Sequence, residues 1–214
     1  HGYSVLAIDL PGHGYSEGPA LESIEEQGQW ISDVIDSVGM EEASLVGHSQ
    51  GCLVVMECAS QFPNKIKSIG LMGGAGAIPM NPELLDLAEK GDVKAVDLMM
   101  DWAHGPAGHF GGHPVPGLHH INLGGSIVIN GSVKNALGVD FRACDNYKNG
   151  FEAAKKIKCP AINILGDRDR MCPLKEGKKL ADNIEDSEVE IIENCGHMIL
   201  LEEAGKSLEI LKKF

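Results

Sequence analysis

The chain has 214 residues, 43% of them hydrophobic, and a formal net charge of −13 at pH 7. This length suffices for one domain with a sizeable core, or for such a domain with a lid. The negative charge argues against nucleic acid or an anionic membrane surface as a partner. No apolar run approaches the roughly 20 residues that would span a bilayer.

The first forty residues predict a strand, a loop and a helix. Residues 5–8 form an apolar run that predicts a buried strand, and a loop rich in Gly follows at 10–16. An amphipathic helix is predicted over 21–38, because its apolar residues recur near helical spacing. Gly39 supplies the end of this helix.

The next part of the chain continues the alternation. We predict a strand at 43–46, a helix over 52–59 that ends near Pro63, and a strand over 66–72. Strands that alternate with helices predict a parallel sheet with helices on both faces.

The alternation stops near residue 78. Residues 81–102 have a helical pattern, whereas 105–131 contain eight Gly and three Pro. A long irregular insertion in a compact domain usually acts as a lid or binding loop. We therefore assign 78–157 to a lid, and we expect 105–131 to be mobile, to gate access and to be cleaved first in limited proteolysis.

The alternation resumes after Lys158. The pattern predicts a strand at 161–165, a helix over 174–184, a strand at 188–192 and a closing helix over 198–214. Residues 1–77 and 158–214 are therefore expected to form one α/β core.

Ser49 lies between a predicted strand and a predicted helix, within Gly-His-Ser-Gln-Gly at 47–51. A sharp strand-to-helix turn projects a serine hydroxyl out of the sheet, and the flanking glycines permit the strained turn. A serine hydroxyl becomes a good nucleophile only when a base takes its proton and a third group holds that base. An acid and a histidine should therefore follow later strands at the same edge of the sheet.

Both partners occur at such positions. Asp167 and Asp169 follow the predicted strand at 161–165, and His197 follows the strand at 188–192. The order Ser, Asp, His is the order found in α/β-hydrolases. The spacing alone leaves both aspartates open as the acid.

Four motifs carry a resemblance to the α/β-hydrolase fold enzymes of the large single-domain group. These are Asp-x-Pro-Gly-x-Gly-x-Ser at 9–16, the serine motif at 47–51, Gly-x-x-Asp-x-x-x-Pro at 166–173, and Gly-His-x₄-Glu at 196–202. The resemblance covers 2–78 and 158–214. It implies a mostly parallel, doubly wound sheet with a helical or irregular lid insertion, and it places the acid on Asp169 rather than Asp167.

The resemblance implies a serine hydrolase that cleaves a small carboxylic ester or related acyl substrate with water, through an acyl-enzyme and without a cofactor. Its catalytic residues would be Ser49, Asp169 and His197, with the backbone N–H of Gln50 in the oxyanion hole. Candidate substrate-binding residues are His48, Met99 and Trp102. A serine nucleophile argues against the haloalkane dehalogenase and epoxide hydrolase chemistries, which use Asp at this position in the family.

Several alternatives remain open at this stage. The same triad serves thioesterases, lactonases, C–C bond hydrolases, acyltransferases and cofactor-free peroxidases, since fold does not determine substrate. The chain could also be a non-catalytic ligand-binding member or an inactive fragment. The sequence does not indicate an oligomeric state.

The start of the chain also bears on the fold. The family usually begins with two or three further strands and a His-Gly loop that donates a second oxyanion N–H, and this chain begins with neither these nor Met. We therefore interpret the first strands as missing, and we expect the strand at 5–8 to lack its neighbour beside 43–46. Because unpaired buried polar groups cost roughly 1–3 kcal/mol each, we expect residues 1–214 alone to be insoluble, molten or inactive.

Histidines and cysteines suggest two further kinds of site. The histidines of the insertion are His104, His109, His113, His119 and His120. They do not match the spacing HExxH, and no acidic residue lies among them, so a solvated or substrate-facing lid is favoured over a metal site. The six cysteines form no CxxC pair, which predicts reduced thiols and a cytoplasmic protein. Cys195, near His197, is interpreted as a packing residue.

Overall fold

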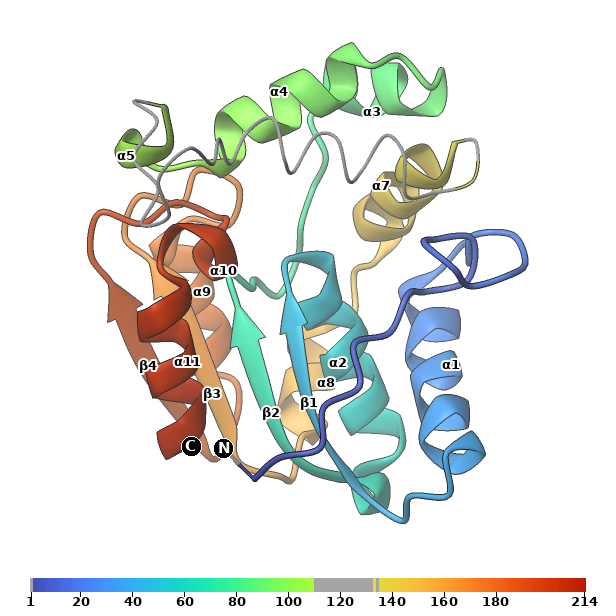
Figure 1. Cartoon of the computed structure of the whole chain (residues 1–214), viewed down its shortest axis with the longest axis vertical. Coiled ribbons are helices and arrows are strands. Elements are labelled where there is room, and N and C mark those ends of the chain that lie inside the picture. Colours follow the sequence, from blue (N-terminus) through green and yellow to red (C-terminus); the bar gives the residue numbers. More distant parts are fainter. Residues whose placement is uncertain (1, 110–132, 134) are drawn as a thin grey trace.

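The centre of the molecule is a four-stranded parallel sheet. The computed structural model describes residues 2–109, 133 and 135–214. Its strands are β1 (Ala43–His48), β2 (Ile66–Met72), β3 (Ala161–Gly166) and β4 (Ser187–Ile192), in the spatial order β1-β2-β3-β4. Each strand pairs in parallel with the next (Figure 1). The parallel sheet predicted from the sequence is confirmed.

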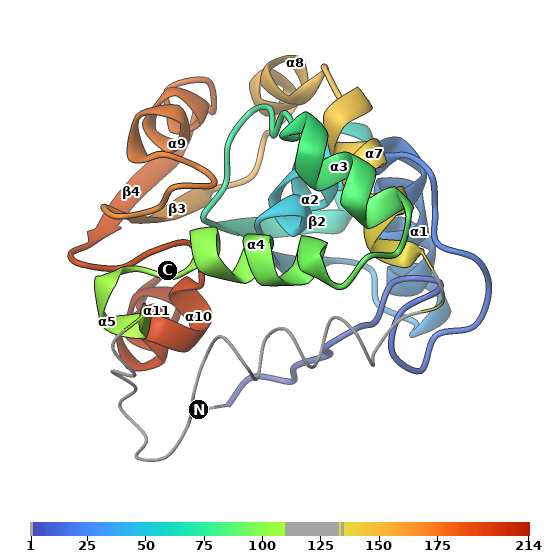
Figure 2. The same cartoon turned by 90° about the horizontal axis from the view of Figure 1, so that it is seen from above.

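Helices cover both faces of this sheet. One face carries α2 (Gln50–Gln61), α8 (Gly150–Lys156) and α9 (Leu174–Ala181), and the opposite face carries α11 (Ala204–Lys213), as Figure 2 shows. All six residues of β3 are buried. A parallel strand covered on both faces requires an uninterrupted apolar run, which is the pattern that predicted β3. Helix α1 (Ile24–Ser37) packs on α2, and a 3₁₀ turn (Pro63–Lys65) joins α2 to β2.

A second group of helices, which we call the cap helices, lies over the carboxyl ends of the strands (Figures 1 and 2). It comprises α3 (Pro82–Glu89), α4 (Lys94–Ala103), α5 (Pro106–His109) and α7 (Ala136–Asn146). The single helical pattern predicted over 81–102 is divided because Gly91 has a φ of +67°, a conformation that ends a helix. Most of the predicted mobile segment lies outside the described residues, and so do His113, His119, His120 and the side chain of His109.

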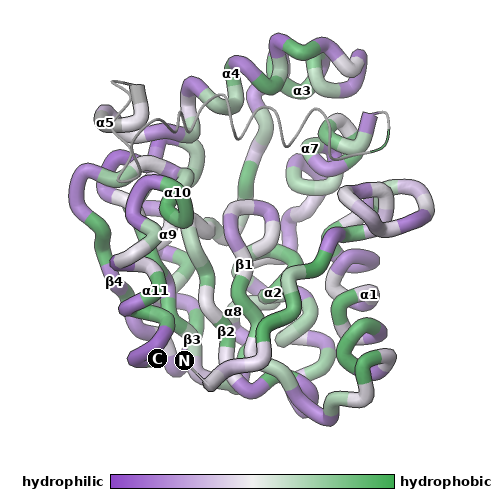
Figure 3. The backbone as a smooth tube through the Cα atoms, in the orientation of Figure 1, coloured by the Kyte–Doolittle hydropathy of each residue, from purple (hydrophilic) through white to green (hydrophobic). Residues whose placement is uncertain are grey.

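The predicted strand at 5–8 is wrong as a strand. This segment has no ladder partner, although it contains hydrophobic residues (green in Figure 3), and Val5 is 84% and Leu6 61% exposed. An isolated extended chain leaves its backbone groups to water, so a strand forms only where another strand pairs with it. Among the described residues, β1 pairs with β2 alone.

Three further helices differ from the sequence-based expectation. The closing helix is divided into α10 (Ile199–Glu202) and α11, and α7 and α8 were not predicted. Gly138 lowers the helix propensity of α7. It is nevertheless required there, because a Cβ at this position would lie 2.8 Å from the Cα of Glu89. No helix in the described ranges is long and apolar enough to cross a membrane.

Candidate active site

Ser49 occupies a strained turn between β1 and α2. Its backbone has φ 55° and ψ −120°, a region that residues with a side chain rarely adopt. The Ser49 N–H donates to the carbonyl of Met72 on the neighbouring strand at 3.0 Å. A Cβ on Gly47 would lie 2.2 Å from the carbonyl oxygen of Gly51, so the strand and the helix can meet this closely only because residue 47 is glycine.

Substitutions of the two glycines in this turn should therefore have opposite outcomes. We expect Gly47→Ala to lower the free energy of unfolding by about 1–3 kcal/mol, because the added methyl group displaces the first turn of α2. Gly51→Ala is the matched control, since a Cβ there has nothing within 4 Å and alanine favours a helix. Urea unfolding of both variants measures the difference, and equal stabilities would contradict the close approach at residue 47.

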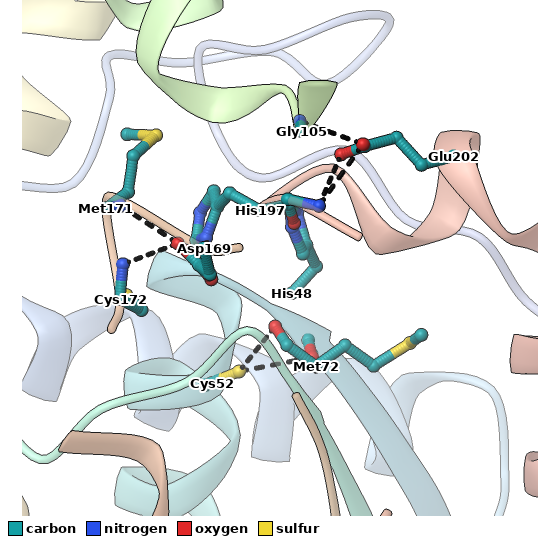
Figure 4. A network of polar contacts seen from close by, with 11 residues as sticks. His48, Cys52, Met72, Gly105, Asp169, Met171, Cys172, His197 and Glu202 are labelled. Carbon is teal, nitrogen blue, oxygen red and sulfur yellow. Dashed lines mark hydrogen bonds and ion pairs between the residues drawn. The ribbon is translucent and has the colours of Figure 1, made fainter. Parts of the chain in front are cut away.

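Asp169 and His197 are in direct contact below the cap helices. The Asp169 Oδ2 accepts a hydrogen bond from His197 Nδ1 at 2.8 Å, and the two side chains are 1% and 2% exposed. The other oxygen, Oδ1, accepts from the backbone N–H groups of Met171 at 2.8 Å and Cys172 at 2.7 Å (Figure 4). Asp167, the alternative acid, lies 3.6 Å from Arg168 Nε instead.

His197 lines the same cavity as Ser49. The Nε2 atom is buried and has no hydrogen-bond partner in the part of the chain that the structure describes. Ser49, Asp169 and His197 follow β1, β3 and β4, so they meet at the carboxyl edge of the sheet. The Ser49 hydroxyl is not hydrogen-bonded to Nε2, and catalytic hydrogen bonds commonly shorten only when substrate is bound.

The backbone of His197 is fixed from the core side by His48. The Nε2–H of His48 donates to the His197 carbonyl at 2.7 Å, and the ring centroids lie 4.8 Å apart. Burial lowers the pKa of His48 to about 4. His48 is therefore neutral at pH 7 and acts as a single fixed donor.

The loop that carries His197, residues 193–198, which we call the histidine loop, is also fixed by α4. The carbonyl of Ala103 accepts from the N–H of His197 at 2.7 Å and of Met198 at 3.1 Å. The carboxylate of Glu202 accepts from the N–H of Gly105 at 2.9 Å and of Gly196 at 3.1 Å (Figure 4). The end of α4 and the histidine loop therefore form one hydrogen-bonded junction.

A cavity of about 240 Å³ separates the turn at Ser49 from the cap helices. Its polar wall consists of His48, Ser49, Gln50 and His197. The remaining wall is apolar and rich in methionine, formed by Ile78, Met80, Met99, Met100, Ala103, Leu137, Phe141, Cys144, Met171 and Met198. No Lys or Arg belongs to this lining among the described residues. Gln50 is the first residue of α2, so its backbone N–H has no partner within the helix.

The structure places the three candidate substrate-binding residues differently. His48 and Met99 line the cavity, whereas Trp102 is not among its lining residues. Trp102 packs against the apolar cluster of the cap, to which Met99 and Met100 also belong. Met171 and Met198 were not predicted as lining residues, although each lies inside or beside a motif that places a catalytic candidate.

The histidines and cysteines considered above form no metal-binding cluster among the described residues. No group of three or more His, Cys, Asp or Glu that could hold a metal ion occurs in the described ranges. The Nδ1 of His104 lies 2.9 Å from the carbonyl of Met100 at the end of α4. Cys195 is buried, and burial raises the pKa of its thiol to about 12, so it remains protonated at pH 7.

Comparisons with known proteins agree with this arrangement. The family described as alpha/beta hydrolase fold matches residues 1–110. The chain is 25% identical over 229 aligned positions to the 2-hydroxymuconate semialdehyde hydrolase of Pseudomonas sp. (strain CF600), covering 98% of this chain and 75% of that one. It is 28% identical over 227 positions to monoacylglycerol lipase abhd6-A of Xenopus laevis, covering 98% and 66%.

Solved structures show the same similarity. A thermophilic esterase superposes with a TM-score of 0.81 at 27% identity, covering 96% of this chain and 78% of the esterase. The enol-lactonase of Burkholderia xenovorans LB400 superposes with a TM-score of 0.83 at 21% identity, with the same coverage of 96% and 78%. At 21% identity, the similarity to the enol-lactonase establishes the fold alone.

Proposed function

The chain is an enzyme of the alpha/beta hydrolase fold family, and we propose that it is a serine hydrolase that cleaves uncharged carboxylic esters with an apolar acyl group. The observation that carries this proposal is the cavity that Ser49 and His197 line together with an apolar wall. The Nε2 atom of His197 has no hydrogen-bond partner among the described residues. Asp169, hydrogen-bonded to the opposite nitrogen of His197, supports the assignment of the acid.

In the proposed first half-reaction, Ser49 Oγ attacks the ester carbonyl carbon while His197 Nε2 takes the hydroxyl proton. The Asp169 carboxylate orients the imidazole and stabilises the cation that forms. The N–H of Gln50 donates to the developing oxyanion. As the carbon–oxygen bond to the leaving group breaks, His197 returns the proton to that oxygen, and an alcohol departs from the acyl-enzyme.

In the second half-reaction, water attacks the acyl carbon and gives a proton to His197 Nε2. The bond to Ser49 Oγ then breaks, the carboxylic acid leaves, and Ser49 regains the proton from His197. This chemistry uses only water and groups of the chain. We also propose that residues 78–157 contain the lid, because α4 and α7 lie over this edge of the sheet and supply six of the ten apolar lining residues. Helix α8, at the end of this range, packs on a face of the sheet instead.

The composition of the cavity favours one of the activities named for the relatives over another. The substrate named for the Pseudomonas hydrolase, 2-hydroxymuconate semialdehyde, carries a carboxylate. A buried carboxylate requires a cation or several donors, and the described lining contains neither Lys nor Arg. An uncharged ester, of the class suggested by the monoacylglycerol lipase, requires no such partner.

A matched pair of substrates tests this proposal. We expect kcat/KM for p-nitrophenyl hexanoate to exceed that for mono-p-nitrophenyl adipate by at least about 100-fold, because the terminal carboxylate of the adipate ester would lose its hydration without gaining a partner. It should also exceed that for p-nitrophenyl acetate by about tenfold or more, since each buried methylene contributes about 0.8 kcal/mol.

Covalent labelling provides the second measurement. An alkyl fluorophosphonate should modify Ser49, which mass spectrometry of the peptide containing residues 47–51 can verify. Equal turnover of the hexanoate and adipate esters would contradict the proposed substrate class. Failure of Ser49 to be labelled would contradict the serine mechanism.

A further inference from the structure

Four polar side chains from four parts of the chain meet beside the first turn of α2. Gln50 donates its two Nε2 hydrogens to Gln27 Oε1 of α1 at 3.0 Å and to Asp140 Oδ1 of α7 at 3.2 Å. The second oxygen of Asp140 lies 2.9 Å from Nε2 of His13, which belongs to the loop at 9–16. We call these four residues the Gln50 network.

The geometry around His13 indicates a charged imidazole. Its Nε2 faces Asp140, and its Nδ1 lies 3.1 Å from the carbonyl oxygen of Pro11. Both neighbours are acceptors, so both ring nitrogens can be satisfied only when each carries a proton. The hydrogen bond to Asp140 accordingly raises the pKa of His13 above its usual value.

Other charged groups of the surrounding elements do not compete for this pair. Asp9 of the same loop accepts from the backbone N–H of Tyr15. On α1, Glu26 accepts from the N–H of Glu22. On α7, burial raises the pKa of Cys144 to about 12, so it stays an uncharged thiol.

The Gln50 network fixes the orientation of the Gln50 side chain through two hydrogen bonds, one to Gln27 and one to Asp140. Gln27 is 1% exposed and is itself held, because its Nε2 donates to the Leu21 carbonyl at 3.2 Å. Asp140 and His13 are also shielded, with 14% and 22% of their side chains exposed. Since both hydrogens of the Gln50 amide are used, the side chain of Gln50 has one favoured orientation.

The Gln50 network also connects two parts of the proposed site. The backbone N–H of Gln50 is the proposed oxyanion donor, and α7 contributes Leu137, Phe141 and Cys144 to the apolar wall. We propose that Asp140 is a positioning residue. Through its ion pair with His13, it holds Gln50 and the α7 residues that line the cavity in fixed positions relative to each other. This inference rests on the proposed serine hydrolase function.

Replacement of Asp140 by asparagine tests the inference. We expect Asp140→Asn in the full chain to lower kcat and kcat/KM for p-nitrophenyl hexanoate by about tenfold, less than the loss of a whole oxyanion donor, which costs about 10²–10³. Asp140→Glu, which keeps the charge, should restore part of the rate. Thermal unfolding of each variant shows whether the chain still folds.

The pH profile separates positioning from a general loss of structure. The ion pair is present while His13 is protonated, so the wild-type rate should fall as the pH rises through the raised pKa of His13. Asp140→Asn and His13→Asn should lower the rate and remove its decline at alkaline pH. The pKa of His13, measured by NMR, should fall in Asp140→Asn.

Glu89→Gln is the matched control. It breaks the ion pair between Glu89 and Arg142, which also fastens α7 but lies away from Gln50. We expect less than a twofold change in rate and an unaltered pH profile. If Asp140→Asn behaves like Glu89→Gln while the wild type turns over esters normally, the positioning role is overturned. If the wild type shows no ester turnover and no Ser49 labelling, the proposed function fails as well.

Discussion

Ser49→Ala and His197→Ala should each lower kcat for an ester by about 10⁴–10⁶, and the double variant should lose little more. In the proposed mechanism, the serine supplies the attacking oxygen and the histidine moves its proton, so removing either one disables the same step. Steady-state kinetics on p-nitrophenyl hexanoate measures all three variants. The residual rate reflects the oxyanion donor and substrate binding alone.

The control for this result is a serine away from the cavity. Ser44, on β1, accepts a hydrogen bond from the Ser68 hydroxyl at the exposed side of the sheet, and Ser44→Ala should keep normal turnover. Fluorophosphonate labelling should persist in Ser44→Ala and disappear in Ser49→Ala. Losses that add in the Ser49/His197 double variant would show that the two residues act in separate steps.

Asp169→Asn should lower kcat by about 10⁴, whereas Asp167→Asn should change it by less than about threefold. Only Asp169 touches His197, and a neutral amide there can neither stabilise the imidazolium nor select the tautomer that leaves Nε2 free to accept a proton. Asp167 lies beside Arg168 with 27% of its side chain exposed. The two substitutions lie two residues apart and change charge equally, so they control for each other.

The unfolding behaviour of the same variants completes this test. Asparagine can retain an oxygen for the N–H groups of Met171 and Cys172, so the Asp169→Asn protein should stay folded while losing turnover. A large rate loss in Asp167→Asn, with Asp169→Asn unaffected, would move the acid two residues back along the chain.

The strands around the candidate site could be predicted because their signals are local. The bounds of β2 agree with the prediction, and β3 and β4 differ from it by one residue. The run at 5–8 has the same apolar character but is not a strand, because a strand also depends on a partner that its own residues do not encode. Composition predicts the tendency to form a strand, and pairing determines whether one forms.

Contacts between distant residues could not be predicted in this way. Gln50 and Asp140 are 90 positions apart, and the apolar pattern of α7 is interrupted by Gly138, which packs against the end of α3. Trp102 was assigned to the cavity by its residue type, whereas its position on α4 places it in the cap cluster. Motifs were enough to name the candidate residues Ser49, Asp169 and His197, but the arrangement of the cavity walls around them depends on tertiary packing.

The junction between the end of α4 and the histidine loop has a thermodynamic consequence. Three backbone N–H groups, those of Gly105, His197 and Met198, donate across it to the Glu202 carboxylate and the Ala103 carbonyl. Separating the two segments would break all three hydrogen bonds together, so they behave as a single cooperative opening unit. A fluctuation that lifts this end of α4 therefore removes the bond that holds the N–H of His197, while its carbonyl keeps the bond from His48.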